Sequence, residues 1–321
     1  MGMTRLVKPP RLEPGAVVAV VAPASAPPDP RAIDHSVAAL NSLGYKPLLG
    51  RHVRNRRGFL AGTDRERSSD LMAAFLNPKV GGILCVRGGY GSGRLLPLLD
   101  YRAIRAHPKV LAGYSDITSL HCALHVGSGL VSFHGPMLNS DFIRDDLPRF
   151  TLLSFQRAVS EAGASGSIVE GYRGNSVRIL RKGKASGRLI GGNLSLLCSL
   201  VGTPWECGFR GAILFFEDVA EVPYRFDRML TQLLNAGRLA GVSGIAVGVN
   251  ANCVERGVRR SREYRQTLED VLRERLLPLK VPMVTGLPFG HIRHNATLPF
   301  GVRATLDGNE GDLRIDEPAV A

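Results

Sequence analysis

The sequence predicts an α/β protein of two domains, the first built on a parallel sheet and the second, smaller one with a mixed strand order. Apolar runs of strand length alternate with helix-like stretches through the first half of the chain. That alternation is typical of a parallel sheet covered by helices on both faces. Near residue 160 the pattern changes to short strands and turns. The length of 321 residues also allows two domains, since a domain has about 150 residues on average.

The first half contains residues that mark where its elements end. The first helix ends at Gly44 and the second at Asn77-Pro78, because glycine and proline do not continue a helix. The active residues of such a sheet should follow the carboxyl ends of its strands. We expect strands at 16–23, 81–89, 109–113 and 130–136, and helices at 32–45, 64–78 and 117–129.

The second half begins after a stretch of small and polar residues, EAGASGS (161–167), which is typical of a linker. We therefore expect a first domain over 1–160, a linker over 161–170 and a second domain over 171–321. The last helix of this half should end at Gly237, a common helix stop. We expect short strands within 167–192, further strands at 211–219, 244–250 and 281–291, and helices at 193–202 and 224–237.

The net charge of +13 is compatible with an acidic or nucleic-acid partner. The basic residues are scattered, however, and the denser stretches at 51–57 and 255–265 carry no platform of aromatic residues. A surface that binds nucleic acid would interleave stacking side chains with its charges. We interpret both stretches as solvated faces and expect no nucleic-acid partner.

The cysteines and the apolar runs indicate the cellular compartment of the protein. The five cysteines are odd in number, form no C-x-x-C motif and lie mostly within apolar runs. This usage indicates reduced thiols and a cytoplasmic protein. The run AVVAVVAP (16–23) is short and follows Pro14-Gly15, so we expect a buried first strand there and no signal peptide. We expect no membrane partner, because no apolar stretch approaches the roughly 20 residues of a membrane span.

The stretch VLAGYSDITSLH (110–121) raises the question of why a serine stands where an apolar strand meets a helix-like pattern. Serine is a common helix N-cap, since its oxygen accepts a hydrogen bond from an orphan backbone N–H. A strand-to-helix corner can also expose a nucleophilic serine at the edge of a sheet. Both interpretations of Ser115 stay open on this stretch alone.

Two further polar features follow expected strands: Glu217 and Asp218 after AILFF, and His291 after VTGLPFG. Together with a serine they are the parts of a serine hydrolase, in which a base activates the hydroxyl and an acid orients the base. Each also has a plain structural explanation as a cap, a solvated acidic turn or a surface histidine. Glu217 is favoured as the acid because it is the first polar residue after the apolar run. Asp218 should point to the opposite side, and Glu221 lies in the following turn.

The glycine-rich stretch RGGYGSGR (87–94) offers backbone N–H groups to an anion or an oxyanion, or forms a tight turn. It is not a Walker A motif, because no G-K-[ST] follows. His121 and His125 stand four residues apart, as metal ligands can, but without the glutamate of an H-E-x-x-H motif. We assign them packing or surface roles and expect neither a metal nor another cofactor.

Several of these stretches belong to a longer series of motifs. The series begins with VAPAS, RGGYGSGRLLPLLD (87–100), GYSDITSLH (113–121) and FHGPM (133–137). It continues with GGNLSLLCSLVGTPW (191–205), LFFEDVAEVPYRFDRML (214–230), and GLPFGH with a later LPFG. In this order, over about residues 14 to 306, they resemble the LD-carboxypeptidase family of serine peptidases, which includes the microcin-C self-immunity proteins.

The resemblance implies a triad with Ser115 as nucleophile, Glu217 as orienting acid and His291 as base. It implies an oxyanion hole made by the backbone N–H groups of Gly89 and Asp116. It also implies a C-terminal domain with barrel-like character, a site between the two domains and a homodimer.

The murein-recycling branch of the family removes the terminal D-alanine from cytoplasmic tetrapeptides, and we expect this small-peptide substrate. Arg87 and Arg293 lie near the motifs and are candidates for binding a carboxylate, although surface charge explains them equally well. The alternative substrate, from the immunity branch, is an acyl-sulfamoyl adenylate. Its base would stack on Tyr172 or Phe209, since Trp205 is expected in the core. A non-catalytic ligand-binding or nucleic-acid-binding protein is the alternative of another class.

Overall fold

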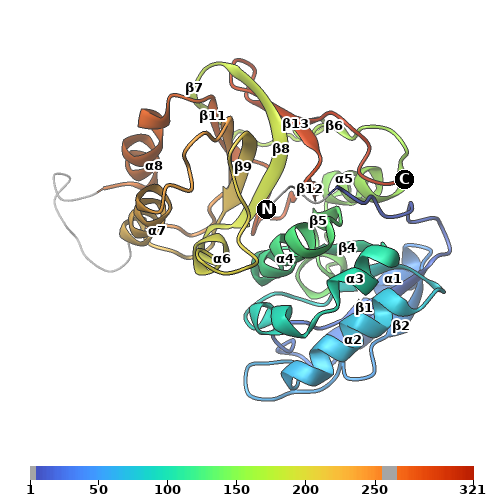
Figure 1. The fold of residues 1–321 in the computed structure, drawn as a ribbon. Helices are drawn as coiled ribbons and strands as arrows, with labels where there is room; N and C mark the ends of the chain where they lie inside the picture. The colour runs from blue at the N-terminus through green and yellow to red at the C-terminus, as the bar shows by residue number, and fades with distance from the viewer. Residues whose placement is uncertain (1–4, 255–265) are drawn as a thin grey trace.

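The computed structural model describes residues 5–254 and 266–321. Its strands form two sheets, one of six strands and one of eight. The chain first builds the part coloured blue to green in Figure 1 and then the part coloured yellow to red. The basic stretch 51–57 forms turns at the surface, whereas the stretch 255–265 lies outside the described residues.

The first sheet is parallel except at one edge. Its parallel strands, in spatial order, are β5 (Ser132–His134), β4 (Val110–Gly113), β3 (Val80–Cys85), β1 (Val17–Val21) and β2 (Lys46–Leu49). Beyond β5, β12 (Leu298–Phe300) adds an antiparallel edge strand, although it comes from the last part of the chain. The two halves of the chain are therefore joined through this sheet.

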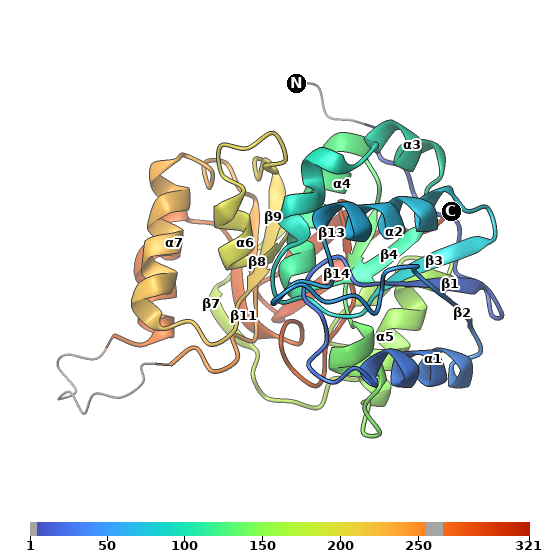
Figure 2. The same ribbon diagram turned by 90° about the horizontal axis from the view of Figure 1, so that it is seen from below.

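Helices cover both faces of the first sheet, as the buried apolar strands require. Figure 2 shows α2, α3 and α4 on one face and α1 and α5 on the other. In α2 a capping box between Thr63 and Glu66 explains the helix start. The α-helices are α1 (Ala32–Ser42), α2 (Asp64–Leu76), α3 (Tyr101–Ala106), α4 (Thr118–Ser128) and α5 (Arg149–Ser160). Two 3-10 helices, η1 (Ser92–Leu98) and η2 (Ser115–Ile117), and the π-helix η3 (Leu138–Phe142) stand between them.

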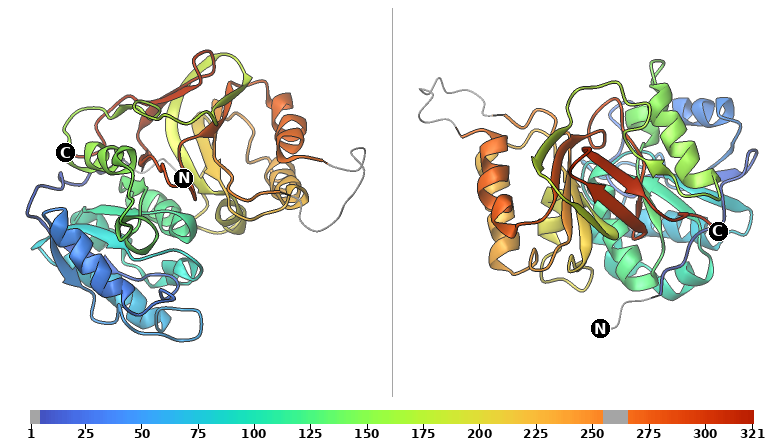
Figure 3. Two further views of the ribbon diagram at one scale, coloured as in Figure 1. Left: turned by 180° about the vertical axis from the view of Figure 1, so that it is seen from behind. Right: turned by 90° about the horizontal axis from the view of Figure 1, so that it is seen from above.

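The second sheet is mixed. Its central strands run parallel: β8 (Lys184–Asn193), β9 (Ala212–Glu217), β10 (Gly244–Gly248) and β11 (Met283–Leu287). Antiparallel strands flank them: β7 (Arg178–Arg181) beside β11, and β13 (Arg303–Asp307), β14 (Asp312–Ile315) and β6 (Gly166–Ser167) beyond β8. Its helices are α6 (Leu194–Ser199), α7 (Pro223–Asn235) and α8 (Leu268–Leu276), followed by the short turn η5 (Leu277–Leu279). Helices α7 and α8 pack side by side at the end of the molecule away from the first sheet (Figure 3).

The predicted fold class is confirmed: a parallel α/β part is followed by a mixed α/β part. In the described part of the chain the second sheet is open, because its edge strands β6 and β7 do not pair with each other. Strand β6 lies inside the expected linker and pairs with β14 of the second sheet. The domain limits themselves stay a prediction.

Candidate active site

Ser115 stands at the corner that follows β4, with a φ of +63°. This left-handed conformation is uncommon for a residue other than glycine, and it concentrates at functional sites. The side chain caps neither η2 nor α4, whose N-cap residues are Tyr114 and Ile117. The capping interpretation of Ser115 is therefore wrong. Ser115 is half-buried at this corner, and its side chain makes no cap hydrogen bond to η2 or α4.

The glycine-rich stretch 87–94 lies directly against this corner. A Cβ on Gly88 would stand 3.0 Å from Ser115 Cβ and 3.2 Å from both Ser115 Oγ and the backbone nitrogen of Asp116. Only a residue without a side chain leaves that space open beside the hydroxyl. The N–H of the next residue, Gly89, donates to no acceptor in the described part of the chain. Sequence reasoning did not distinguish Gly88 from its neighbours.

The side chain of Asp116 ties the glycine-rich stretch to the corner. Its buried carboxylate accepts hydrogen bonds from the backbone N–H groups of Gly91 at 3.3 Å and Ser92 at 2.8 Å. The Ser92 hydroxyl donates to the Asp116 carbonyl oxygen at 2.6 Å. These three bonds fix the position of the loop relative to Ser115. The sequence interpretation gave a role only to the Asp116 N–H and missed this clamp.

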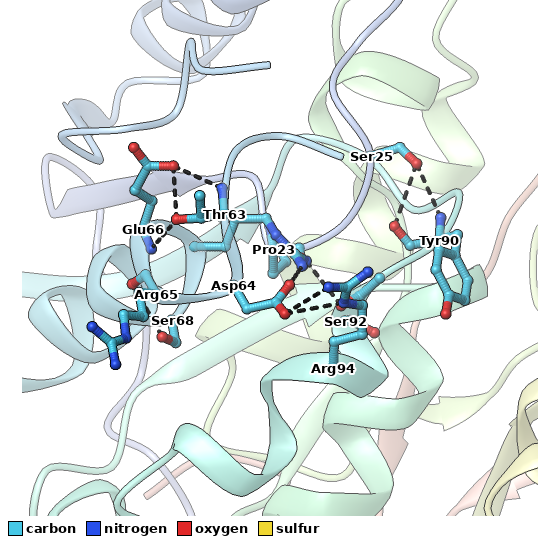
Figure 4. Close-up of polar contacts among 12 residues, drawn as sticks. Pro23, Ser25, Thr63, Asp64, Arg65, Glu66, Ser68, Tyr90, Ser92 and Arg94 are labelled. Carbon is cyan, nitrogen blue, oxygen red and sulfur yellow. Dashed lines mark hydrogen bonds and ion pairs between the residues drawn. The ribbon is translucent and has the colours of Figure 1, made fainter. Parts of the chain in front are cut away.

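The same stretch is held from its other side by the VAPAS motif. Tyr90 N–H donates to Ser25 Oγ at 3.1 Å, and Ser25 Oγ donates to the Tyr90 carbonyl at 3.4 Å (Figure 4). The buried guanidinium of Arg67 donates to the carbonyl oxygens of Gly91, at 2.8 Å, and Pro23. Backbone N–H groups of a loop held on both sides keep a fixed direction, which an oxyanion hole requires.

Glu217 and His291 meet through a short hydrogen bond. Glu217 ends β9 and is fully buried, and His291 stands in the loop that follows β11. Nδ1 of His291 lies 2.6 Å from Oε2 of Glu217. The preceding residue, Gly290, has a φ of +112°, and a Cβ there would approach Glu217 Oε2 to 2.8 Å. A glycine at this position therefore permits the close approach of the carboxylate.

Asn193, at the end of β8, links the acid to the segment that carries the serine. Its side-chain amide lies 3.5 Å from Glu217 Oε1 and donates to Asp218 Oδ1 at 2.9 Å. Its backbone N–H donates to Thr118 Oγ1 at 2.9 Å, at the start of the helix behind Ser115. The sequence interpretation quoted the motif that contains Asn193 without giving the residue a role. A polar residue at the carboxyl end of a strand was the signal that could have found it.

The two competing carboxylates are occupied elsewhere. Asp218 accepts hydrogen bonds from the backbone N–H of Ser195 at 2.9 Å and from its hydroxyl at 2.7 Å. Glu221 pairs with Arg225 at 3.2 Å. Of the three carboxylates considered from the sequence, Glu217 alone contacts His291.

The electrostatic surroundings favour the charged form of His291. Burial lowers the pKa of this imidazole, but the hydrogen bond and the charge of Glu217, with the charges of Asp218 and Asp141, raise the pKa by more. The net shift of the His291 pKa is upward from its ordinary value near 6.5. For Asp141, burial raises the pKa of the carboxyl to about 6. A histidine beside a buried acid is suited to accept and then return a proton.

A pocket of about 270 Å³ opens beside His291. Tyr114 lines it and packs edge-on against the imidazole, with ring centroids 5.0 Å apart. The structure therefore brings Tyr114, which directly precedes Ser115 in the chain, together with His291 and Glu217. No hydrogen bond joins Ser115 Oγ to His291 among the described residues. Such bonds are often long in an enzyme without its substrate and tighten when the substrate binds.

The two parts of the chain match two models of one protein family. Residues 18–135 match the LD-carboxypeptidase N-terminal domain, and residues 186–306 match the LD-carboxypeptidase C-terminal domain. The chain belongs to the LD-carboxypeptidase family. It is therefore an enzyme, a serine-type hydrolase.

Relatives and solved structures agree with this membership. The chain is 41% identical to the probable murein peptide carboxypeptidase of Bacillus subtilis, over 94% of this chain and 92% of that protein. It resembles the crystal structure of muramoyltetrapeptide carboxypeptidase from Oxalobacter formigenes with a TM-score of 0.78 and 33% identity, over 94% and 100% of the two chains. The structure of MccF in complex with glutamyl sulfamoyl guanosine has a TM-score of 0.87 and 26% identity, over 98% and 99%.

The two arginines considered for carboxylate binding occupy different places in this LD-carboxypeptidase. Arg293 lines the pocket beside His291 and pairs with Asp146 at 2.8 Å. Arg87 donates to the carbonyl oxygen of Ala26 at 3.3 Å. A second arginine of that pocket, Arg144, was not considered from the sequence.

The aromatic candidates for stacking differ in exposure. Phe209 is buried in the core, so it is not available to a ligand. Trp205, expected in the core, is only half-buried and packs against the core. Tyr172 is half-buried and contacts Phe150 at a centroid distance of 5.7 Å. The Tyr172 hydroxyl lies 2.9 Å from Ser176 Oγ.

The paired histidines of α4 face the interior. His121 is fully buried, with Nδ1 at 2.8 Å from Ser132 Oγ and Nε2 at 2.8 Å from the Gly113 carbonyl oxygen. Burial lowers the pKa of His121 to about 4. His125 packs edge-on against Phe300.

All five cysteines are free and buried. In residues 5–254 and 266–321, no helix is long and apolar enough to cross a membrane.

Proposed function

We propose that this LD-carboxypeptidase hydrolyses the bond between an L-centre and the terminal D-alanine of murein tetrapeptides in the cytoplasm. The observation that carries the proposal is the 2.6 Å contact between His291 Nδ1 and Glu217 Oε2 beside the corner that bears Ser115. The names of the Bacillus and Oxalobacter relatives support a murein peptide as the substrate.

In the proposed acylation step, Ser115 Oγ attacks the carbonyl carbon of the scissile bond while His291 Nε2 takes its proton. Glu217 accepts the hydrogen bond from Nδ1–H, which fixes the tautomer and stabilises the imidazolium. The carbonyl oxygen becomes an oxyanion that the backbone N–H groups of Gly89 and Asp116 stabilise. The C–N bond then breaks as His291 returns the proton to the nitrogen of the leaving D-alanine.

In the proposed deacylation step, a water molecule repeats the attack on the ester. His291 takes a proton from the water, and the new tetrahedral intermediate releases Ser115 Oγ, which recovers its proton from the imidazolium. The shortened peptide leaves with a new carboxylate. The raised pKa of His291 assists the return of the proton to each leaving group.

The test uses a murein tetrapeptide and its analogue that ends in L-alanine. Mass spectrometry should show loss of one alanine from the first peptide and none from the second. Ser115→Ala should lower turnover on the order of 10³-fold or more while the thermal unfolding profile stays that of the parent. A parent protein that leaves the tetrapeptide intact, or a Ser115→Ala protein with parental turnover, would contradict the proposal.

A second candidate substrate is an acyl-sulfamoyl nucleotide. The observation that favours it is the similarity to MccF in complex with glutamyl sulfamoyl guanosine, which extends over 98% of this chain. The same assay with an aminoacyl-sulfamoyl adenosine decides between the two, by comparing kcat/KM for the two substrates. A non-catalytic protein that binds a ligand or nucleic acid would cleave neither substrate, and its binding would survive Ser115→Ala.

The assembly is also a proposal. We expect a homodimer, as the family resemblance implies, and light scattering of the purified protein at several concentrations tests it. A mass that corresponds to one chain at all concentrations would exclude the dimer.

A further inference from the structure

The pocket beside His291 is one end of a longer depression. It shares Leu147, Pro148 and Arg293 with a second pocket of about 480 Å³. These two pockets and a third that adjoins the second are together called the arginine groove. Since the first pocket contains His291, the arginine groove begins at the proposed catalytic centre.

The second pocket continues into a third of about 380 Å³. The two have Arg149, Phe150, Gly171 and Arg173 in common. The arginine groove therefore runs from His291 along the start of α5 and the segment that follows this helix. Its combined size suits a ligand larger than one amino acid, since ligand pockets usually measure about 300–1,000 Å³.

Among the described residues, five arginines line the arginine groove, against two exposed carboxylates and the buried Asp141. Asp146 is shared by Arg144, at 3.1 Å, and Arg293, at 2.8 Å. Arg157 pairs with Glu170 at 2.8 Å. The remaining two lining arginines are Arg149 and Arg173.

Among the described residues, Arg149 and Arg173 have no partner for their guanidinium groups. Both are exposed, and neither makes a hydrogen bond or ion pair through its side chain with residues 5–254 or 266–321. Both line the second and the third pocket. A guanidinium presents a planar fork of donors that matches a carboxylate in two parallel hydrogen bonds. The middle of the groove thus offers two free sites for carboxylates.

The size of the groove decides which part of a peptide it can hold. A carboxypeptidase that releases one D-alanine has a single small residue on the leaving side of the scissile bond. Three joined pockets exceed the needs of that residue, so the groove fits the longer acyl side. In a murein tetrapeptide this side carries the free α-carboxylate of a γ-linked D-glutamate and, where diaminopimelate is present, another carboxylate.

We infer that the arginine groove binds the acidic acyl side of the peptide, with Arg149 and Arg173 pairing with its free carboxylates. This inference rests on the proposed function and adds to it a recognition element for substrate charge remote from the scissile bond. Phe150 lines the same two pockets as these arginines and supplies an apolar contact for the peptide.

The test compares the double variant Arg149→Gln/Arg173→Gln with the matched control Arg102→Gln. Arg102 is exposed on α3, on the opposite face of the first sheet from α5 (Figure 2), and makes no side-chain ion pair among the described residues. The double variant should raise KM for the tetrapeptide roughly tenfold or more, the loss expected for charge-assisted contacts. The kcat should stay within about twofold, because these contacts are the same in the ground state and the transition state. The control should match the parent.

Two further substrates show whether the effect depends on carboxylates. N-acetyl-L-lysyl-D-alanine has none on its acyl side, and the double variant should cleave it with the parental KM. A tetrapeptide whose D-glutamate α-carboxylate is amidated should bind the parent more weakly, and its KM should rise less in the double variant. An unchanged KM for the tetrapeptide, or an equal loss on all three peptides, would overturn the inference.

Binding to the Ser115→Ala background separates this inference from the proposed function. If the parent fails to cleave any peptide, the proposed function fails. Calorimetry then still measures whether the Ser115→Ala protein binds the intact tetrapeptide, and whether adding Arg149→Gln/Arg173→Gln weakens that binding. Absence of peptide binding, or an effect of the double variant only on an aminoacyl-sulfamoyl adenosine, would overturn the arginine groove as a peptide site.

Discussion

His291 Nδ1 donates to Glu217 Oε2 at 2.6 Å, although 74 residues separate the two in the chain. The carboxylate is fully buried, and the imidazole is half-buried at the edge of a pocket. A buried carboxylate that holds one ring nitrogen leaves the other ring nitrogen free to act on a substrate. The contact gives the first prediction.

Glu217→Gln should lower kcat far more than Asp218→Asn or Glu221→Gln. The amide keeps the shape of the side chain but cannot stabilise the imidazolium, and a comparable change in a serine protease lowers kcat about 10⁴-fold. Steady-state kinetics on the tetrapeptide measures all three variants. Circular dichroism controls for folding, because Asp218 holds the start of α6. A severe Glu221→Gln with a mild Glu217→Gln would transfer the acid role to Glu221.

The pH profile of kcat/KM should have an acid limb with its midpoint above 6.5. Only neutral His291 can take the serine proton, and the charges around it raise the pKa of His291. As the pH falls through this raised pKa, the imidazole gains a proton and activity is lost. Asp141→Asn removes one of the charges that raise the pKa of His291, so the midpoint should move to lower pH.

Asp145→Asn is the matched control for the pH experiment. Asp145 lies four residues from Asp141 and is exposed, and no hydrogen bond or ion pair within the described residues engages its side chain. Its replacement should leave the midpoint where the parent has it. A midpoint that stays fixed or rises in Asp141→Asn would show that the Asp141 charge does not act on the titrating base.

Gly88→Ala should reduce kcat/KM by about tenfold or more without a matching loss of stability. The added methyl would stand 3.2 Å from both Ser115 Oγ and Asp116 N, in the space where the carbonyl of a substrate must enter. Gly163→Ala is the control, because a Cβ there meets nothing within 4 Å. Steady-state kinetics measures kcat/KM for both variants, and thermal unfolding measures their stability. Parental kcat/KM in Gly88→Ala would mean that the substrate approaches Ser115 from another side.

Metal chelators should leave the activity intact. The imidazole nitrogens of His121 are both engaged, by Ser132 and by the Gly113 carbonyl, and the proposed chemistry needs no metal. Dialysis against EDTA followed by the tetrapeptide assay measures this. If EDTA abolished the activity and zinc restored it, the prediction would be wrong and His121 and His125 would be the candidate zinc ligands.

The local pattern of the sequence predicted much of the fold. The buried runs that became β1, β3 and β4 are apolar throughout, and the stop at Asn77-Pro78 agrees with α2 ending at Leu76. Other elements had signals that went unused. The capping box of Thr267 and Asp270 marks the start of α8, and Pro148 directly precedes α5. These features are readable because they depend on neighbours along the chain.

The sequence by itself determined that a serine, an acid and a histidine follow strands. What only the tertiary structure decided is their mutual distance, the bridge of Asn193 to Thr118, and the pairing of β12 with the first sheet. The arginine groove also exists only in the folded chain, since its lining comes from Tyr114 and from the segments 140–157, 165–173 and 291–297. Periodicity reports which face of an element is buried, but it carries no information on which distant segment covers that face. Contacts between segments far apart in the chain depend on how whole layers pack, and this packing is set by all the side chains together.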